Sequence, residues 1–397
     1  MVNPTQVFHN PHPYALADSP VSDAPLAFHR RLPGYQPTPL VELPGLARQL
    51  GVGRLWLKAE AQRLGLPSFK ILGAAWAVYR ALVERLGGEP AWATLDTLAA
   101  HLAPLRPLSL AAATDGNHGR AVAHMARLLG LTARIFVPTG TAAARIAAIA
   151  SEGASVTVVD GSYDDAVARS AELAGPRCLV ISDTSWPGYE DVPRQVIAGY
   201  GTIFAEVDAE LVTRGEPLPG LVIVQMGVGA LAAAAVGHYR RLDSAAPPRL
   251  IGVEPTRAAC VLASLRAGTI VSVPAPHDSI MAGLNCGAPS LIAWPLLQAG
   301  LDLCLAIDDH YACQAVRALA SAGIAAGETG AAGLGGLLAL RELPSAAAAA
   351  GLGANTSVLL IATEGVTDPA ARARILASNC RIDCVAGRAC AQEAPGR

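Results

Sequence analysis

Residues 108–123, LSLAAATDGNHGRAVA, decide how the fold is read. An apolar run ends in a polar turn, and the turn opens an alanine-rich segment. A strand followed directly by a turn and a helix is the repeating unit of parallel sheets. We therefore expect a strand through 108–114 and a helix that begins near Asn117.

The same unit recurs through the middle of the chain. Three further strands are expected at ARIFVP (133–138), SVTVVD (155–160) and CLVISD (178–183), with helices that begin near Gly140 and Tyr163. Short strands that alternate with helices indicate parallel βαβ units with right-handed crossovers. These residues predict one doubly wound sheet.

A second series of strands predicts another sheet. Its strands are LVIVQMG (221–227), RLIGVEP (249–255) and SVLLIATEG (357–365). A helix is expected from Ala230 and further helices through 257–340, whereas PSAAAAAGLGAN (344–355) is interpreted as a low-complexity linker. The predicted fold class is α/β, with two doubly wound open sheets in two lobes.

Length and composition agree with a globular protein of two lobes. The chain has 397 residues, 52% of them hydrophobic, and a formal net charge of −2. This balance offers no basic surface for nucleic acid, so we expect no nucleic-acid partner. The N-terminal residues lack the basic and apolar regions of a signal peptide, and we expect a soluble cytoplasmic protein with no membrane partner.

The eight cysteines predict thiols rather than a disulfide framework. The C-terminal stretch CRIDCVAGRAC (380–390) holds three of them but has no CxxC spacing and no histidine. We therefore predict no metal site there and interpret the stretch as a terminal strand or loop.

Lys70 opens an apolar, alanine-rich helical stretch, PSFKILGAAWAVY (67–79). Its carbon stem could lie along apolar surface while the ammonium reaches water. Alternatively, a desolvated lysine loses its proton easily and acts as a base or forms a Schiff base. This segment alone leaves both interpretations open.

Three loops follow strands and open helices, where parallel sheets bind ligands. MGVGALAAA (226–234) could hold a phosphate or form an ordinary tight turn, and it lacks the spacing of a dinucleotide or P-loop motif. ATDGNHG (113–119) could bind an anion or simply cap its helix. In ATEGVTDP (362–369), Thr363 could face a ring nitrogen or cap the next helix.

The order of these segments resembles that of fold-type II pyridoxal phosphate enzymes, the group that includes the tryptophan synthase β chain. Within this group, ATDGNHG and DTSWPGYEDVP (183–193) are most similar to the diaminopropionate ammonia-lyase family. Further matching segments are GSYDDAV (161–167), AGLNCG (282–287), GETGAAGLGGL (327–337) and TEGVTDP (363–369). The resemblance covers nearly the whole chain.

The resemblance implies pyridoxal 5'-phosphate as cofactor and an amino acid as substrate. Lys70 would carry the cofactor as a Schiff base, and Asn117 would contact the ring hydroxyl. Thr363 would face the pyridine nitrogen. The phosphate would lie against the backbone of Gly227, Val228, Gly229, Ala230 and Leu231.

The implied reaction is α,β-elimination of 2,3-diaminopropionate to pyruvate and ammonia. Lys70 would take the Cα proton of the L-isomer and Asp115 that of the D-isomer, although Asp115 could instead bind the second ammonium of the substrate. The substrate site would be formed by Thr114, Asp115, Gly116, Tyr163 and Asp183. For Tyr163 and Asp183, a purely structural role stays open.

Two departures from the family pattern stand out. The phosphate loop has Ala230, Ala232 and Ala233 where relatives are richer in glycine, and Val366 replaces a usual polar residue. Backbone N–H groups bind the phosphate, so the alanines should preserve it. Val366 is expected to alter the surroundings of the ring nitrogen or the helix cap.

Other functions remain as alternatives. A threonine or serine dehydratase, or a β-replacing synthase, would keep Lys70 and the glycine loop without needing Asp115. A non-catalytic amino-acid sensor could use the same scaffold. A nicotinamide oxidoreductase is disfavoured, although Glu254 lies near the distance expected of its ribose-binding acid.

The predicted domains are a large cofactor-binding domain, residues 1–92 and 221–397, and a small substrate-closing domain, residues 93–220. A homodimer is implied by the family resemblance.

Overall fold

Two separate β-sheets organise the computed structural model, which describes residues 4–11, 22–240 and 246–378. The larger sheet has seven strands and the smaller has four. The strands are β1 (Gln6–His9), β2 (Leu40–Glu42), β3 (Arg54–Ala59), β4 (Ser109–Ala113), β5 (Thr132–Pro138), β6 (Ser155–Val159), β7 (Cys178–Val180), β8 (Leu221–Gln225), β9 (Arg249–Pro255), β10 (Leu303–Ile307) and β11 (Ser357–Ala362).

Helices cover both sheets and connect their strands. The α-helices are α1 (Ala24–His29), α2 (Pro44–Leu50), α3 (Lys70–Leu86), α4 (Leu95–His101), α5 (Asn117–Leu128), α6 (Ala143–Ala150), α7 (Tyr163–Ala171), α8 (Asp191–Arg214), α9 (Ala230–Tyr239), α10 (Cys260–Ala267), α11 (Trp294–Gly300), α12 (Asp309–Ser321), α13 (Glu328–Arg341), α14 (Pro344–Ala349) and α15 (Pro369–Ala377). Short 3₁₀ helices lie at Ala103–Leu105, Thr256–Ala258 and Ala282–Leu284. Among the described residues, no helix combines the length and the apolarity that crossing a membrane requires.

The large sheet has the strand order β1-β10-β9-β8-β11-β3-β2, and only its edge strands β1 and β2 run antiparallel to their neighbours. Its central strands are apolar on both faces. In β8, Leu221 and Ile223 belong to one apolar cluster, which includes residues of α12 and α13, while Val222 and Val224 belong to another, which includes residues of α9. Burial on both faces explains the continuous apolar run LVIV in this strand.

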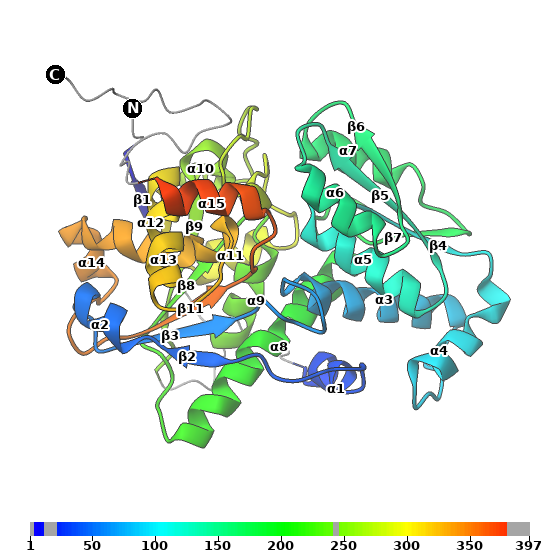
Figure 1. The fold of residues 1–397 in the computed structure, drawn as a ribbon, viewed down its shortest axis with the longest axis horizontal. Coiled ribbons are helices and arrows are strands. Elements are labelled where there is room, and N and C mark those ends of the chain that lie inside the picture. The colour runs from blue at the N-terminus through cyan, green and yellow to red at the C-terminus, as the bar shows by residue number, and fades with distance from the viewer. Residues whose placement is uncertain (1–3, 12–21, 241–245, 379–397) are drawn as a thin grey trace.

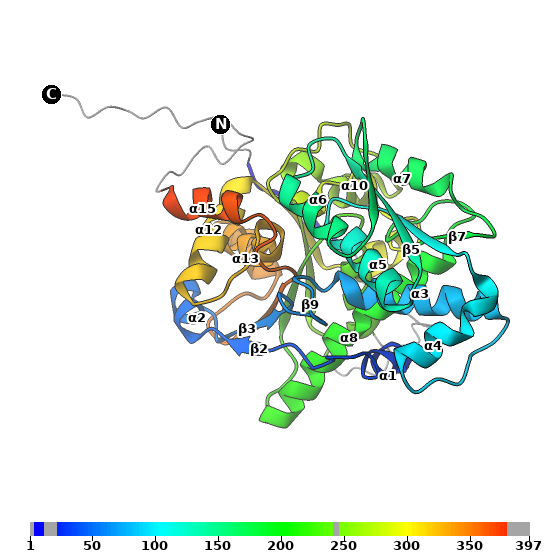
Figure 2. The same ribbon diagram turned by 45° about the vertical axis from the view of Figure 1, so that its right-hand side comes forward.

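The small sheet is parallel throughout and has the order β6-β5-β4-β7. Figure 1 shows it with α5, α6 and α7 to the right of the large sheet, and Figure 2 shows the same arrangement after rotation. We call this sheet with α5–α7 the small lobe, and the seven-stranded sheet with its helices the large lobe. The fold class predicted from the sequence is thus confirmed.

Each sheet has one point at which the strand order reverses. In the small lobe the chain moves from β4 to β5 and β6, and then returns to the other side of β4 with β7. In the large lobe it moves from β8 to β9 and β10, and returns beside β8 with β11. Ligands bind at the carboxyl ends of the strands at such points. The two lobes therefore each contribute one binding edge.

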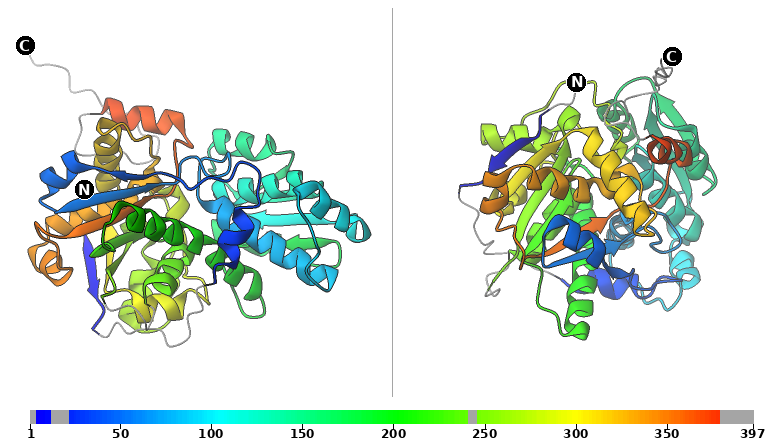
Figure 3. Two further views of the ribbon diagram at one scale, coloured as in Figure 1. Left: turned by 90° about the horizontal axis from the view of Figure 1, so that it is seen from below. Right: turned by 60° about the vertical axis from the view of Figure 1, so that its left-hand side comes forward.

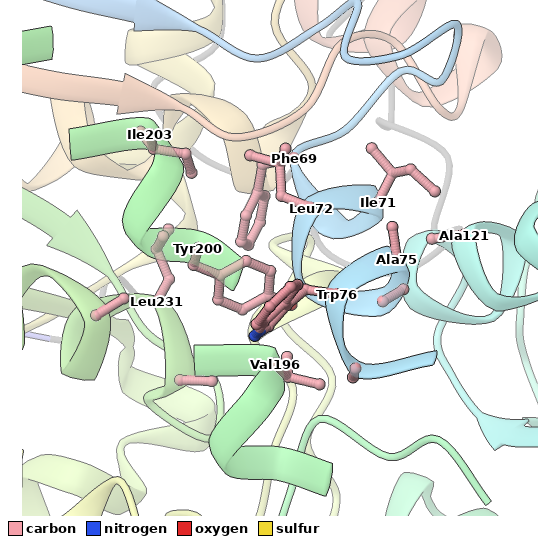
Figure 4. Packing of buried hydrophobic residues seen from close by; sticks show 14 of the residues in the cluster. Phe69, Ile71, Leu72, Ala75, Trp76, Ala121, Val196, Tyr200, Ile203 and Leu231 are labelled. Carbon is pink, nitrogen blue, oxygen red and sulfur yellow. The ribbon is translucent and has the colours of Figure 1, made fainter. Parts of the chain in front are cut away.

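Helices α3 and α8 pack closely, and two glycines permit the approach. A Cβ on Gly73 would lie 2.4 Å from Cε1 of Tyr200, and one on Gly199 would lie 2.6 Å from the Leu72 carbonyl oxygen. Figure 4 shows Phe69, Leu72 and Trp76 beside Tyr200 and Val196 in this contact. The contact positions the first turn of α3, which carries Lys70. The left-hand view of Figure 3 shows the two lobes from below.

Most predicted elements lie where the sequence places them, with two corrections. The region 257–340 is not purely helical, because LCLAI forms the buried strand β10. Cysteine and alanine make this run ambiguous, and only pairing with β9 and β1 makes it a strand. The predicted linker at 344–355 contains helix α14, since alanine favours helices and Pro344 suits a first helical position. The cysteine-rich stretch 380–390 lies outside the described residues.

Candidate active site

A cleft lies at the carboxyl ends of β4, β7, β8 and β11. Every predicted site residue except Gly116 lines it: Lys70, Thr114, Asp115, Asn117, Tyr163, Asp183, Gly227, Val228, Gly229, Ala230, Leu231 and Thr363. These residues come from segments scattered between positions 70 and 363. The reversal points of the two sheets bring them together.

Lys70 stands at the first position of α3, with its backbone N–H donating to Ser68 Oγ at 3.3 Å. Its ammonium does not extend into bulk water. Nζ donates to Asp183 Oδ2 at 2.5 Å, and the side chain is 19% exposed. Burial acts to lower the pKa of Lys70, but the Asp183 carboxylate outweighs it and the pKa is raised. The ligand-free chain therefore holds Lys70 as an ammonium inside the cleft.

Asp183 follows β7 and is the anchor of this ion pair. Burial opposes its ionisation, yet the Lys70 ammonium lowers the pKa of Asp183 well below its ordinary value. The hydroxyl of Tyr163 donates to Asp183 Oδ1 at 2.9 Å. Behind it, Nε2 of His118 donates to the Ile181 carbonyl oxygen at 2.7 Å, and burial lowers the pKa of His118. Asp183 is thus a carboxylate beside a neutral imidazole.

The turn after β4 presents Asp115 to the cleft. Thr114 Oγ1 accepts the N–H of Gly116 at 2.8 Å and so closes the turn. Gly116 precedes α5, and no side chain caps that helix. Helix capping therefore does not explain Asp115 or Asn117. Burial raises the pKa of Asp115, with Arg145 and Lys70 acting against this shift.

Asn117 connects the two lobes. Its Nδ2 donates to Oε2 of Glu364, which follows β11 in the large lobe. The other oxygen of Glu364, Oε1, is buried and has no hydrogen-bond partner among the described residues. This hydrogen bond joins the first turn of α5 in the small lobe to the segment after β11 in the large lobe.

The loop before α9 is a ready anion cradle. Gly229 has a φ of +92°, and a Cβ there would lie 2.4 Å from Cδ1 of Leu297. Among the described residues, none accepts a hydrogen bond from the backbone N–H groups of 227–231. Unpaired N–H groups at the start of a ten-residue helix favour an anion. The alanines of the loop do not disturb this geometry.

Thr363 ends β11 at the cleft and is held by Gln225. Nε2 of Gln225 donates to Thr363 Oγ1 at 3.0 Å, which leaves the hydroxyl hydrogen free to point into the cleft. Thr363 does not cap the following helix, because Asp368 accepts the N–H of Ala371 at the start of α15. Val366 is not among the residues that line the cleft. No direct contact of its side chain with the cleft therefore supports the expected effect on a ring nitrogen.

These features fit pyridoxal phosphate. The chain offers a lysine within the cleft, an anion cradle with unpaired N–H groups, and a hydroxyl that suits an unprotonated ring nitrogen. The cradle and the lysine line the same cleft, as a ligand with an aldehyde and a phosphate requires. The donor set of the cleft contains no competing arrangement, since no group of three metal-ligating side chains occurs in the described residues.

Sequence reasoning missed several residues of the site. Glu364, Gln225 and His118 line the cleft, and Arg145 donates to the backbone oxygen of Asp115 at 3.3 Å. Glu364 and His118 lie in ATEGVTDP and ATDGNHG, the motifs from which Thr363, Asp115 and Asn117 are predicted. Nothing near Arg145, in an alanine-rich helix, signals a role in the site.

The position of Glu254 does not support the alternative of a nicotinamide oxidoreductase. Its carboxylate accepts the N–H groups of Val261 and Leu262, both at 2.8 Å, and so caps α10. Burial raises the pKa of Glu254 to about 7. This acid is enclosed in the large lobe and is not presented to a ribose.

The comparisons with known proteins agree with this geometry. Residues 31–364 match the model of the pyridoxal-phosphate dependent enzyme family. The diaminopropionate ammonia-lyase of Salmonella typhimurium is 35% identical over 370 residues, covering 89% of this chain and 91% of the relative. That of Escherichia coli strain K12 is 37% identical over 363 residues, covering 87% of this chain and 89% of the relative.

Solved structures show the same similarity in three dimensions. The crystal structure of the Escherichia coli diaminopropionate ammonia-lyase with D-serine has a TM-score of 0.86 and 32% identity, and it covers 95% of this chain and 98% of its own. The structure of that enzyme with an aminoacrylate-PLP azomethine reaction intermediate has a TM-score of 0.85, with 32% identity and coverage of 95% and 97%. The chain belongs to the pyridoxal-phosphate dependent enzyme family, in the branch of the diaminopropionate ammonia-lyases.

Proposed function

We propose that the chain catalyses the pyridoxal phosphate-dependent α,β-elimination of 2,3-diaminopropionate. One substrate molecule and one water give pyruvate and two molecules of ammonia. The observation that carries the proposal is the presence of two carboxylates, Asp115 and Asp183, beside Lys70 in one cleft. A substrate with two ammonium groups brings two positive charges to this acidic site. The names of two similar relatives, both diaminopropionate ammonia-lyases, support the same substrate.

The residues of the chain divide the binding of the cofactor among them. Lys70 would hold it covalently through Nζ, the backbone of 227–231 would bind its phosphate, and Thr363 would face its ring nitrogen. Asn117 would contact the ring hydroxyl. When bound, pyridoxal phosphate supplies an electron sink for the charge that develops on the substrate Cα.

Two bases would serve the two substrate isomers. Lys70 Nζ, once released from covalent attachment, removes the Cα proton of the L-isomer, and Asp115 removes that of the D-isomer from the opposite face. The β-ammonium then leaves as neutral ammonia and takes the electron pair of its bond to carbon. Because the leaving nitrogen already carries its proton, the step needs no separate acid.

The remaining site residues would orient the substrate. Asp183 loses the Lys70 ammonium as a partner when the lysine binds the cofactor, so it becomes free to accept a substrate ammonium, with Tyr163 holding its other oxygen. The turn of Thr114 and Gly116 at the start of α5 suits the substrate carboxylate.

Two larger features are proposed with this function. Residues 93–220 would form the domain that closes over the substrate, and residues 1–92 with 221–397 the domain that binds the cofactor. The separation of the sheets into two lobes supports this division (Figure 1). We also propose a homodimer, on the basis of the family resemblance, and a cytoplasmic location, which is the expectation from the sequence.

The test compares substrates and variants side by side. Pyruvate and ammonia release would be measured from L- and D-diaminopropionate, serine and threonine, with wild type, Lys70→Ala and Asp115→Asn. We expect diaminopropionate to be the best substrate, Lys70→Ala to lose the visible Schiff-base absorbance, and Asp115→Asn to lose the D-isomer selectively.

Other outcomes select the alternatives. If serine or threonine is turned over best, the chain is a hydroxy-amino-acid dehydratase with the same cofactor. A protein that binds pyridoxal phosphate and releases no product from any of these amino acids would instead support a sensor.

A further inference from the structure

Arg145 is a charged residue beside the cleft for which the proposed reaction has no assigned use. It lies on α6 of the small lobe and is partly buried. Nη1 donates to the backbone oxygen of Asp115 at 3.3 Å, and Nη2 donates to Thr367 Oγ1 at 3.2 Å. Thr367 belongs to the segment after β11 in the large lobe. One guanidinium thus ties the Asp115 turn to the opposite lobe.

The stem of Arg145 also packs against this turn. A Cβ on Gly116 would lie 3.0 Å from Cδ of Arg145, so the turn and the arginine are in close contact. The Nε atom is buried without a partner among the described residues. Buried donors are normally all hydrogen-bonded. Arg145 leaves Nε without a partner in the described part of the chain and directs one Nη to the Asp115 turn and the other to the large lobe.

Charged and titratable groups from several elements face the Asp115 carboxylate. They are Arg145 on α6, Lys70 on α3, Asp183 after β7, Glu364 after β11, His118 on α5, Tyr163 on α7 and Cys286 in the segment 282–287. The cations among them are Arg145 and Lys70. Lys70 must release a proton to act as a base, whereas a guanidinium keeps its charge. Arg145 is therefore the lasting positive charge beside Asp115.

Arg145 in turn faces an acidic surrounding. Glu364, Asp115, Glu328 and Asp368 raise its pKa against the effect of burial, which acts to lower it. Arg145 therefore keeps its positive charge in the site.

We propose that Arg145 is a positioning residue for Asp115, because its guanidinium fixes the turn that carries this carboxylate and keeps a positive charge beside it. The inference rests on the proposed function, in which Asp115 accepts the Cα proton of the D-isomer. Arg145 contacts the backbone of Asp115 and acts through it. Its loss should therefore affect the D-isomer more than the L-isomer, whose proton goes to Lys70.

The direction of the pH effect follows from the charges. Asp115 accepts a proton only as a carboxylate, and burial favours its neutral form. Without Arg145, the carboxyl ionises at higher pH. Turnover of the D-isomer should then fall near neutral pH and recover as the pH rises, while the pH profile of the L-isomer keeps its shape.

The experiment uses Arg145→Met, Arg145→Lys and a control, Arg169→Met, which removes an exposed arginine of the same lobe. The first readout is the ¹³C NMR titration of the Asp115 carboxyl in the cofactor-free chain, assigned with Asp115→Asn. The second is kcat/KM for both isomers against pH in the loaded enzyme. Arg145→Met should move the Asp115 titration to higher pH and lower D-isomer turnover at neutral pH roughly 10-fold or more.

The conservative variant separates charge from packing. Arg145→Lys should restore the position of the Asp115 titration more fully than the D-isomer turnover, because it keeps the charge but cannot hold both acceptors. It also provides the measurement if Arg145→Met does not fold. Arg169→Met should match wild type in both readouts.

Two results would overturn the inference. An unmoved Asp115 titration would show that Arg145 does not set its charge, and an equal loss for both isomers with unchanged pH profiles would show a merely structural arginine. Failure of the proposed function looks different: Asp115→Asn would then leave the D-isomer unaffected, while the NMR titration still reports on Arg145.

Discussion

The chain contains two lysines, Lys58 and Lys70, and their surroundings differ. Lys58 is 1% exposed and donates to the Thr38 carbonyl oxygen at 2.7 Å and to Glu206 at 2.6 Å. Lys70 is 19% exposed and reaches Asp183 at the wall of the cleft. Both are ion-paired, so an ion pair alone does not distinguish a structural lysine from a catalytic one.

The surroundings of Lys58 form a closed network. Arg63 donates to both oxygens of Glu60 and both oxygens of Glu206, and it also donates to Thr38. Two cations and two anions therefore neutralise one another away from water. Around Lys70, by contrast, buried polar atoms of His118 and Glu364 have no partner among the described residues. Unsatisfied polar neighbours and an open cleft thus separate Lys70, the proposed catalytic lysine, from Lys58.

The largest expected effect comes from Lys70→Arg. Arginine keeps the positive charge beside Asp183 but cannot form a Schiff base or lose its proton, so turnover of diaminopropionate should fall roughly 10³-fold or more. The visible absorbance of the bound cofactor should be lost, while the midpoint of denaturant unfolding changes little. Retention of a tenth of the wild-type rate would contradict the role of Lys70.

Lys58→Met tests the buried ion-pair network around Lys58. It leaves a buried network with an excess negative charge, which should lower the free energy of unfolding by about 3–5 kcal/mol. Turnover under folding conditions should stay near wild type, since Lys58 does not line the cleft. The measurement is urea unfolding, with Arg169→Met as the control for an exposed ion pair. A loss no larger than that of the control would show that the network is not essential.

Glu254 adds a third case to the comparison of Lys58 and Lys70: it is a buried ionisable group held by backbone N–H donors instead of an opposite charge. Burial raises its pKa from 4.5 to about 7, so the folded chain favours its protonated form. Protonated Glu254 therefore contributes to the free energy of unfolding, fully at a pH below 4.5, and this contribution is lost as the pH rises through about 7. Between pH 4.5 and about 7, the free energy of unfolding of the wild type should fall by on the order of 3 kcal/mol relative to that of Glu254→Gln.

The check on Glu254 is urea unfolding of both proteins across this pH range. Asp183 should behave in the opposite sense, because its pKa is lowered by Lys70 and its contribution is lost only as the pH falls. Parallel stability curves for wild type and Glu254→Gln would show that Glu254 does not titrate in this range.

Local pattern was sufficient for much of the fold. The run RLIGVEP forms β9 over the predicted residues, and α5, α7 and α9 begin at Asn117, Tyr163 and Ala230 as expected. Pattern failed at β10, where LCLAI has no period that separates a buried strand from a helix. The reason is that a strand buried on both faces loses its alternation.

The site shows the same division. Lys70, Asp115 and Thr363 stand in motifs that carry the family resemblance, which implies their roles, and the fold brings all three to one cleft. Arg145 was not predicted, since its contacts with Asp115 and Thr367 join segments far apart in the chain. Its sequence neighbours in the helix are alanine and isoleucine, which report only that a helix forms.

The amino-acid sequence by itself determined the α/β fold class, because apolar period and short turn motifs are local properties, and its family resemblance implied the cofactor and the role of Lys70. Only the tertiary structure decided that Lys58 is enclosed in a buried ion-pair network and that Lys70 lines a cleft. It also decided which residues cross from one lobe to the other, such as Asn117 to Glu364. These facts depend on which distant groups share a buried space, and that is fixed by packing and by the satisfaction of hydrogen bonds.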